Sequence, residues 1–318
     1  MHDLKGISGV VGGFGLAQQT IEWAAFGYHS FAVKAGAYVS LFRSRTADTL
    51  RIMMPNRAFA SCGAFVAGMA LSGIVQADVA LFGSLMILST YSSQAVFNNI
   101  RDLDGDSVNA PSRPLVSGAL SIGFAWTLMG VLIALGFLFA YLASPFLVAV
   151  NAAYIILGIA YSAVTKARWH LAALTLATTH IVTPIVSGYL VFGQPDLRIA
   201  VVALLMYATN SLVWSIKDYK DVEGDRKTGV LTLPVVLTSQ TAALVTFAAL
   251  ALPLAGGWVA WYVLGLSTVF LAIYLASGVI RLFLGKMLLA DQSPQTASKI
   301  LINFRFALLL EMVGWCLS

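Results

Sequence analysis

The stretch GALSIGFAWTLMGVLIALGFLFA, residues 118–140, contains no charged side chain and indicates the fold class. A transmembrane helix needs about 20 consecutive apolar residues, so this stretch is long enough to cross a bilayer. Comparable windows predict about nine spans, near 56–76, 79–98, 118–140, 145–164, 170–192, 198–217, 239–256, 259–281 and 298–317. Long unbroken runs favour helices over the alternating pattern of a membrane β-barrel. We therefore expect an all-α, polytopic membrane protein.

The composition agrees with a bilayer environment. Of the 318 residues, 59% are hydrophobic and 10% are charged, whereas a soluble domain carries about 25% charged residues. The formal net charge of +5 is explained by basic residues retained on the cytoplasmic side, so no nucleic-acid partner is expected. The two cysteines, Cys62 and Cys316, lie in apolar runs without metal-ligand spacing, and a metal or disulfide role is not indicated.

The basic residues predict the orientation of the spans. They collect before the first span and after the second, fourth, sixth and eighth: Arg51, Arg57, Arg101, Arg113, Lys166, Arg168, Lys217, Lys220, Arg226, Lys227, Arg281, Lys286 and Lys299. The connections on the other side hold almost nothing basic beyond Arg198. By the positive-inside rule, the N-terminus and the basic loops are expected in the cytoplasm. We expect an interfacial segment over 1–45 and a transmembrane domain over 46–318.

Acidic residues are concentrated in two short stretches, which hold seven of the 14 in the chain. Each stretch directly follows an even-numbered span. Residues three and four apart share one face of a helix. This spacing predicts two sets of aligned oxygen-bearing side chains: Asn98, Asp102 and Asp106 in the first stretch, and Asp218, Asp221 and Asp225 in the second.

The aligned side chains indicate a magnesium site. Like charges on one helix face are destabilising unless a cation neutralises them. Mg²⁺ prefers carboxylate and amide oxygens and commonly shares the phosphates of a substrate. Two such faces at one membrane depth could hold two or three Mg²⁺ around a diphosphate and stabilise its departure. The alternatives are two solvated cytoplasmic caps, or the ion path of a transporter, although transporter sites usually lie near the midplane rather than at span ends.

The two stretches resemble the motifs of the UbiA superfamily of intramembrane prenyltransferases. That family has NDxxDxxxD after its second span and DxxDxxxD after its sixth. Here residues 109–118 read NAPSRPLVSG, similar to the family's N-x-P-x-R-P-L-x-S-G, and residues 217–234 read KDYKDVEGDRKTGVLTLP. The second motif is closest to the branch of chlorophyll synthases and digeranylgeranylglyceryl phosphate synthases. The resemblance covers roughly residues 50–318.

The resemblance implies a nine-helix bundle around a central cavity and a prenyl transfer reaction. An isoprenyl diphosphate would be ionised with the help of two or three bridging Mg²⁺, and the allylic cation would alkylate a lipophilic or aromatic acceptor. Asn98, Asp102 and Asp106 match one metal site; Asp218, Asp221 and Asp225 match the other. Among these, Asp102, Asp106, Asp221 and Asp225 are the expected catalytic residues.

Basic residues near the acidic stretches are expected to contact the diphosphate, since Lys acts as a point charge and Arg as a fork. Lys166 ends a Tyr-Ser-x-x-x-Lys pattern that begins at Tyr161 and is similar to one in the family. The full set of expected diphosphate ligands is Lys166, Arg113, Lys217, Arg51 and Tyr161.

Two positions depart from the family pattern. Asn99 stands where most members have Asp, so an uncharged amide replaces a carboxylate. This change favours a second reading, a membrane terpene cyclase that ionises the same diphosphate without an acceptor. Met54 stands where many members have Arg, and Arg51, one turn earlier, is expected to supply the missing cation.

Four polar and aromatic residues are expected to contact the acceptor or the allylic cation: Asn99, His180, Tyr91 and Trp214. Aromatic faces stabilise cations, and polar groups within a span tend to face a cavity or the bundle interior. The alternatives are packing for the aromatic residues and interhelical hydrogen bonding for His180.

A faint two-fold echo connects the acidic stretches. Ile100-Arg101-Asp102 leads to Gly105-Asp106, and Ile216-Lys217-Asp218 leads to Gly224-Asp225. Each stretch opens a predicted cytoplasmic loop. Such a pattern is typical of an old duplication, here of a four-helix unit.

Overall fold

A computed structural model describes residues 44–318, of which Leu50–Ser318 form one compact unit. The predicted interfacial segment 1–45 lies almost entirely outside the described residues, so its nature stays a prediction. The described part of the chain consists of helices and their connections and contains no strand, which confirms the all-α prediction.

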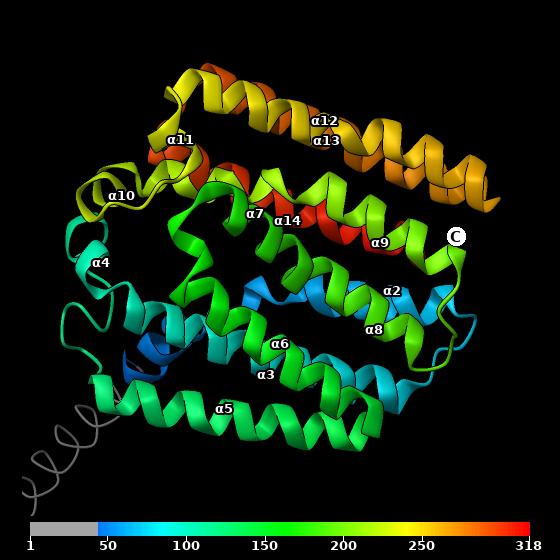
Figure 1. Ribbon diagram of the computed structural model, residues 1–318, viewed down its shortest axis with the longest axis horizontal. Coiled ribbons are helices and arrows are strands. Elements are labelled where there is room, and N and C mark those ends of the chain that lie inside the picture. The colour runs from blue at the N-terminus through cyan, green and yellow to red at the C-terminus, as the bar shows by residue number, and fades with distance from the viewer. Residues whose placement is uncertain (1–43) are drawn as a thin grey trace, which may run out of the picture. The chain divides into compact units, whose positions relative to one another are not determined.

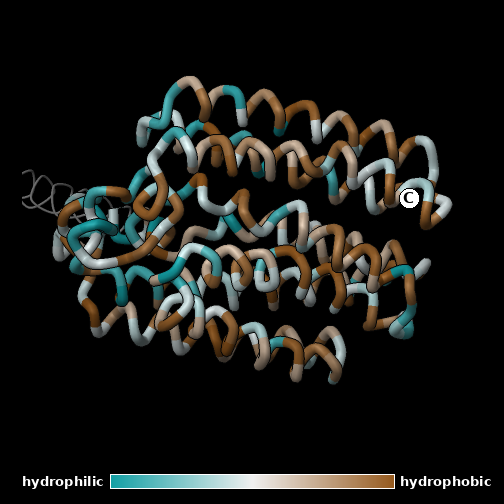
Figure 2. Tube along the Cα trace, turned by 45° about the horizontal axis from the view of Figure 1, so that its top comes forward, coloured by the Kyte–Doolittle hydropathy of each residue, from teal (hydrophilic) through white to brown (hydrophobic). Residues whose placement is uncertain are grey.

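Long helices form a bundle, and short helices gather at one of its ends (Figure 1). In chain order the α-helices are α2 (Phe59–Leu71), α3 (Ala77–Arg101), α4 (Leu103–Asn109), α5 (Ile122–Ala143), α6 (Pro145–Ala163), α7 (Trp169–Ala177), α8 (Thr183–Leu190), α9 (Leu197–Asn210), α10 (Val222–Thr228), α11 (Leu233–Val236), α12 (Ser239–Leu264), α13 (Thr268–Ala290) and α14 (Pro294–Cys316). The end that holds α4 and α10, which we call the acidic end, is also the most hydrophilic (Figure 2).

Seven helical segments of the described chain are long and apolar enough to cross a membrane. They are Ala77–Arg101, Ile122–Ala143, Pro145–Ala163, Trp169–Leu190, Leu197–Lys220, Ser239–Leu264 and Thr268–Ala290. The other two of the nine predicted spans correspond to α2, which has 13 residues, and α14, which carries Lys299, Arg305 and Glu311. The protein is thus an integral membrane protein whose span count is close to the predicted nine.

The prediction for residues 239–281 was wrong in its boundaries. The structure has helices over Ser239–Leu264 and Thr268–Ala290, so Arg281 and Lys286 lie within α13 and not in a loop after it. Arg281 is fully buried and donates a hydrogen bond of 2.6 Å to Glu311 on α14. A charged residue therefore marked a buried ion pair here and not the end of a span.

Glycines let α2 and α8 cross in close contact. A Cβ atom at Gly68 would lie 2.0 Å from the carbonyl oxygen of Ile185, and one at Gly188 would lie 2.0 Å from that of Phe65. Larger residues at either glycine would push the two helices apart. Small residues at helix crossings are the usual way for membrane helices to gain packing energy.

Two spans change their helical geometry, one near its middle and one near the acidic end. Between α7 and α8 the chain forms a π-helical turn, η3 (Thr178–Val182). Pro184 follows it, and a proline ring clashes with the carbonyl four residues earlier, here that of His180. The span that begins with α9 continues as a 3₁₀ helix, η4 (Leu212–Lys220). Both irregular segments line the cavity described next.

Candidate active site

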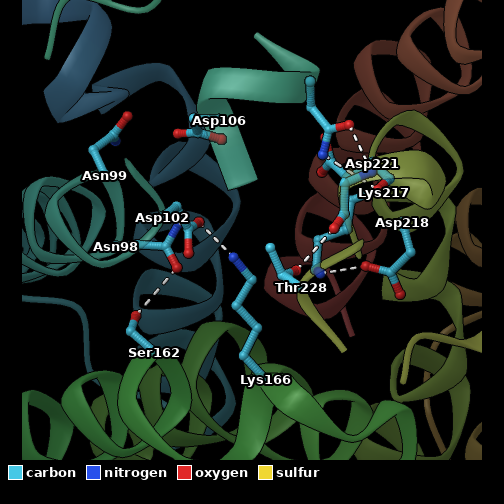
Figure 3. A network of polar contacts seen from close by, with 12 residues as sticks. Asn98, Asn99, Asp102, Asp106, Ser162, Lys166, Lys217, Asp218, Asp221 and Thr228 are labelled. Atoms are coloured by element: carbon cyan, nitrogen blue, oxygen red, sulfur yellow. Dashed lines mark hydrogen bonds and ion pairs between the residues drawn. The ribbon is translucent and has the colours of Figure 1, made fainter. Parts of the chain in front are cut away.

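A cavity of about 340 Å³ opens between the helices at the acidic end. Its wall is strongly polar on one side, where the two acidic stretches face each other across the space (Figure 3). The acidic lining residues are Asp102, Asp104, Asp106, Asp221 and Asp225. The basic lining residues are Arg57, Arg101, Arg113, Lys166, Lys217, Lys220 and Arg305.

All three predicted ligands of the first acidic stretch line this cavity. Asn98 lies in the last turn of α3, Asp102 joins α3 to α4, and Asp106 lies within α4. The amide of Asn98 donates to Asp102 at 2.7 Å and accepts from the Ser162 hydroxyl at 3.2 Å. These bonds hold the amide oxygen and one carboxylate side by side, as Figure 3 shows.

Basic residues neutralise the carboxylates of the first stretch. Lys166 forms an ion pair with Asp102, and Arg113 forms one with Asp106. Burial raises the pKa of the Asp106 carboxyl, and the Arg113 guanidinium opposes that shift. Two of the predicted diphosphate ligands are therefore already in contact with the predicted metal ligands.

Two of the three predicted ligands of the second acidic stretch line the cavity. Asp221 and Asp225 line the cavity, whereas Asp218 is buried beside Lys217, with which it forms an ion pair. Asp218 instead lines a smaller pocket with Trp169. Burial raises the pKa of the Asp225 carboxyl to about 7, and repulsion from Asp218 and Asp221 adds to this effect.

Asn109 ties the two acidic stretches together. Its side-chain oxygen accepts from the backbone N–H of Gly224 at 3.0 Å, and its amide donates to the carbonyl oxygen of Asp221 at 3.2 Å. The residue occurs in the motif tail of the first stretch, but its spacing from the second stretch in the sequence gives no sign of this contact. The side chain thereby fixes α4 relative to α10.

The donor set suits Mg²⁺, although it is not pre-assembled. Within residues 44–318, no group of three or more His, Cys, Asp or Glu side chains is close enough together to hold a metal ion. Mg²⁺ needs only one or two carboxylates when substrate phosphates complete its coordination. Asp102, Asp106, Asp221 and Asp225 face one space and offer the hard oxygen donors that such an ion requires.

Besides Asp218, two predicted site residues do not line the cavity. The Asn99 side chain is buried and donates to the carbonyl oxygens of Ala95, at 2.8 Å, and Ile52, at 3.4 Å. Figure 3 shows it away from the Asp102 and Asp221 carboxylates. Arg51 is also absent from the lining, where Arg57 is present instead. The absence of charge at Asn99 therefore does not alter the cavity wall.

Aromatic residues form the deeper wall. The ring of His180 lies between Tyr91, with ring centroids 4.9 Å apart, and Trp214, 5.6 Å apart. Trp214 also contacts Phe304, and the Lys217 ammonium lies 5.9 Å from the centre of the Tyr161 ring. All of the predicted acceptor or cation contacts except Asn99 thus border one space. The expected interhelical hydrogen bond of His180 is not formed at its Nδ1 atom.

The sequence is similar to known prenyltransferases over most of its length. The UbiA prenyltransferase family is matched over residues 58–309. A digeranylgeranylglyceryl phosphate synthase from Thermococcus sibiricus is 28% identical over 267 residues, which covers 80% of this chain and 90% of that protein. Another from Natronomonas pharaonis is 30% identical over 203 residues, covering 61% of this chain and 70% of that protein.

Solved structures share the fold. A UbiA homologue from Aeropyrum pernix aligns with a TM-score of 0.69 at 20% identity, over 81% of this chain and 96% of that one. A homologue from Archaeoglobus fulgidus, solved with GPP and Mg²⁺, aligns with a TM-score of 0.63 at 19% identity, over 84% of this chain and 99% of that one. With the family match spanning most of the bundle, the chain belongs to the UbiA prenyltransferase family.

Proposed function

We propose that the protein catalyses Mg²⁺-dependent transfer of a prenyl group from an isoprenyl diphosphate to a lipophilic or aromatic acceptor. The observation that carries the proposal is the meeting of two distant acidic stretches, with their basic partners, at the mouth of one aromatic-lined cavity. The homologue solved with GPP and Mg²⁺ supports the same ligand class.

Residues at the acidic end would together promote ionisation of the isoprenyl diphosphate. Asn98, Asp102 and Asp106 on one side, and Asp221 and Asp225 on the other, would hold Mg²⁺, with Asp218 as a further predicted ligand. Bound Mg²⁺ would neutralise the diphosphate and stabilise its negative charge as it leaves. Lys166, Arg113 and Lys217 would turn from their aspartate partners to the phosphate oxygens.

The deeper wall would handle the organic part of the substrate. When the bond between the allylic carbon and the diphosphate oxygen breaks, positive charge develops on that carbon. Tyr91, Tyr161 and Trp214 offer ring faces that stabilise a cation. The acceptor attacks this carbon and loses a proton as the new bond forms.

Cyclisation without an acceptor is less well supported. The feature that favoured it was Asn99 in place of a carboxylate, and the Asn99 amide is bonded to Ala95 and Ile52 away from the cavity. We further propose that the acidic end and the N-terminus face the cytoplasm. Lys166, Arg168, Lys217 and Arg226 lie at that end, as the positive-inside rule requires.

One assay tests the proposed reaction. Purified protein with Mg²⁺ and labelled geranylgeranyl diphosphate should release diphosphate and form a prenylated product only when an aromatic or glycerol-type acceptor is present. Removing one oxyanion-stabilising group typically costs about 10²–10³-fold in rate, and we expect Asp102→Ala and Asp221→Ala to lose at least as much. Asp78→Asn, at the opposite end of α3, is the matched control.

Two results would contradict the proposal. A hydrocarbon or terpene alcohol formed without an acceptor would indicate cyclisation. Absence of diphosphate release with every acceptor, together with Asp102→Ala and Asp221→Ala that behave like the parent, would exclude both reactions.

A further inference from the structure

One buried carboxamide in the cavity wall has a side-chain oxygen without a protein partner. Gln94 lies on α3 one turn before Asn98, lines the cavity and is 8% exposed. Its amide nitrogen donates to the backbone carbonyl oxygen of Tyr154 on α6 at 2.8 Å. Because a carbonyl oxygen can only accept, the nitrogen of the amide must face Tyr154 and the side-chain oxygen must point elsewhere.

The side-chain oxygen of Gln94 borders the cavity. Among the described residues, none donates a hydrogen bond to it. The oxygen nevertheless keeps accessible surface, unlike the buried and unpartnered Nδ1 atom of His180, and the space beside the Gln94 side chain is the cavity. Polar atoms of buried side chains rarely lack a partner, so a group inside the cavity is expected next to this oxygen.

A glycine on the neighbouring helix makes room for the Gln94 side chain. A Cβ atom at Gly158 would lie 2.1 Å from the Cδ atom of Gln94. Gly158 lies on α6 and also lines the cavity. The carboxamide is therefore packed against the backbone of α6 and held there by its hydrogen bond to Tyr154. Its oxygen has a fixed direction before any substrate binds.

The contacts between α3 and α6 place this oxygen one level below the predicted metal ligands. Asn98 accepts from the Ser162 hydroxyl at 3.2 Å, and four residues earlier on each helix Gln94 lies against Gly158. Four residues of α-helix rise by about 6 Å. The neighbouring lining residues of the two helices, Ala95 and Gly158, offer no polar side chain. The Gln94 oxygen is thus the polar group that these two helices present at this level.

Positive charge develops close to this level in the proposed reaction. The allylic carbon is joined to the diphosphate through one oxygen, so it lies within a few bonds of the groups that bind the diphosphate. When the carbon–oxygen bond breaks, the electron pair leaves with the diphosphate, and the positive charge is shared by two carbons of the allyl group. A dipole already aimed at developing charge stabilises the transition state without having to reorient.

We propose that the Gln94 side-chain oxygen stabilises the allylic cation, as a catalytic residue that contacts the reacting carbons without forming a bond to them. The assignment rests on the proposed ionisation of a prenyl diphosphate. It adds a fixed dipole to the aromatic ring faces of Tyr91, Tyr161 and Trp214. Gly158 is the positioning residue that allows the dipole to occupy this place.

A matched pair of unreactive probes separates stabilisation of a cation from binding of a prenyl chain. Geranylgeranyl trimethylammonium carries a positive charge and no N–H group, and the analogue with a tert-butyl group has the same shape without the charge. Calorimetry in detergent with Mg²⁺ and inorganic diphosphate gives the Kd of each probe. A third probe, geranylgeranyl S-thiolodiphosphate, measures binding of the intact donor.

Gln94→Met removes the oxygen and keeps the length of the side chain. It should weaken binding of the ammonium probe by about tenfold relative to the tert-butyl probe, less than the 10²–10³-fold typical of one oxyanion-hole donor. The kcat for diphosphate release should fall by a similar factor. The KM for geranylgeranyl diphosphate and the Kd for the S-thiolodiphosphate should stay within about twofold of the parent, since the interaction is made only with the cation.

Two further variants distinguish an electrostatic role from a structural one. Gln94→Glu loses the same donated hydrogen bond but introduces a negative charge, and at pH 8 it should bind the ammonium probe at least as tightly as the parent. Gly158→Ala keeps the oxygen but displaces it, so it should behave like Gln94→Met.

Gln292→Met is the matched control outside the cavity. The Gln292 amide also donates to helix carbonyl oxygens, those of Leu288 at 2.8 Å and Leu289 at 2.9 Å. Its replacement removes a similar contact, and all of the measured constants should equal those of the parent.

Different failures have different meanings. If Gln94→Met and Gln94→Glu lose binding of the ammonium probe equally, the residue only supports helix packing and the assignment is wrong. If Gln94→Met raises the KM for the acceptor and leaves the ammonium probe unaffected, the oxygen contacts the acceptor and the assignment is again wrong. In both cases prenyl transfer stands as long as the parent binds the S-thiolodiphosphate and releases diphosphate from the true donor. A parent that does neither would contradict the proposed function, and the role of Gln94 with it.

Discussion

At the scale of single residues, the Asp225 carboxyl is expected to couple proton binding to the proposed binding of Mg²⁺. Burial and two neighbouring aspartates raise its pKa to about 7. Without a bound cation the carboxyl is therefore mostly protonated at pH 6 and mostly ionised at pH 8. A magnesium ion that binds this carboxylate must displace the proton, so its affinity should rise with pH.

We predict that the Mg²⁺ concentration for half-maximal diphosphate release falls by about tenfold between pH 6 and pH 8, because the ionised fraction of a carboxyl whose pKa is about 7 rises from about one tenth to about nine tenths over this range. Asp225→Asn cannot bind that proton, and its Mg²⁺ requirement should be higher at pH 8 and nearly flat across this range. Titrations at pH 6, 7 and 8 measure the effect. An equally steep dependence in the variant would assign the proton to another group.

Residue spacing predicted some side-chain positions and not others. Asn98, Asp102 and Asp106 face one cavity, as their spacing predicted. Asp218 does not join Asp221 because η4 ends at Lys220 and Asp221 lies beyond it, at the C-cap, so the two residues do not belong to one continuous helix. Asp218 instead forms an ion pair with Lys217. The predicted alignment assumed a helix that continues through Asp221, and the sequence gives no sign of the break.

At the scale of elements, a buried polar network joins α9, α13 and α14. Arg281 donates to Asn210 at 3.1 Å and to the Thr209 carbonyl oxygen at 3.2 Å, besides Glu311. Ser277 also donates to Glu311, at 2.8 Å. These residues come from separate helices, so neither hydropathy nor spacing could pair them. That is why the sequence predicted a loop at Arg281.

We predict that Glu311→Gln destabilises the bundle because it leaves the Arg281 charge buried without a counter-charge. Breaking a buried ion pair costs about 3–5 kcal/mol, and the unfolding temperature in detergent should fall clearly. The double variant Arg281→Met/Glu311→Leu, which removes both charges, should recover most of the loss. Lys286→Met, which removes an exposed charge from α13, is the control. A double variant less stable than Glu311→Gln would contradict this account.

Asn109 and Gly224 form a second contact between elements, at the acidic end. A Cβ atom at Gly224 would lie 2.1 Å from the Asn109 amide nitrogen, so only glycine fits beside this side chain. Replacing either residue should loosen α4 from α10 and separate the two sets of predicted ligands.

We predict that Asn109→Ala and Gly224→Ala each raise the KM for the prenyl diphosphate by about tenfold, the equivalent of one lost hydrogen bond of about 1.4 kcal/mol. In the double variant the new methyl group meets no clash, so its KM should be no worse than that of Asn109→Ala alone. Unfolding temperature should change little in all three. Strictly multiplicative effects on KM would show that the two residues act independently.

At the scale of the whole molecule, the two halves of the chain contain the same arrangement: a long span, an acidic stretch and a short helix. Each acidic stretch follows the end of a long span, and each continues into a seven-residue helix, α4 or α10. The residues that join them, Asp102 and Asp221, have nearly the same backbone angles, with φ of −93° and −115° and ψ of 6° and 5°. The faint sequence echo thus corresponds to a repeated structure, and the repeat brings both stretches to one end.

We predict that the acidic end faces the cytoplasm. Basic residues are abundant there, whereas Arg198 is near the opposite end, at the start of α9. In a variant with both native cysteines replaced by serine, Glu223→Cys on α10 and Gln76→Cys before α3 place single thiols at opposite ends. A membrane-impermeant maleimide should label Gln76→Cys in intact cells and Glu223→Cys only after permeabilisation, because the positive-inside rule retains the basic end in the cytoplasm. The reverse pattern would place diphosphate chemistry outside the cell, away from the cytoplasmic supply of its substrate.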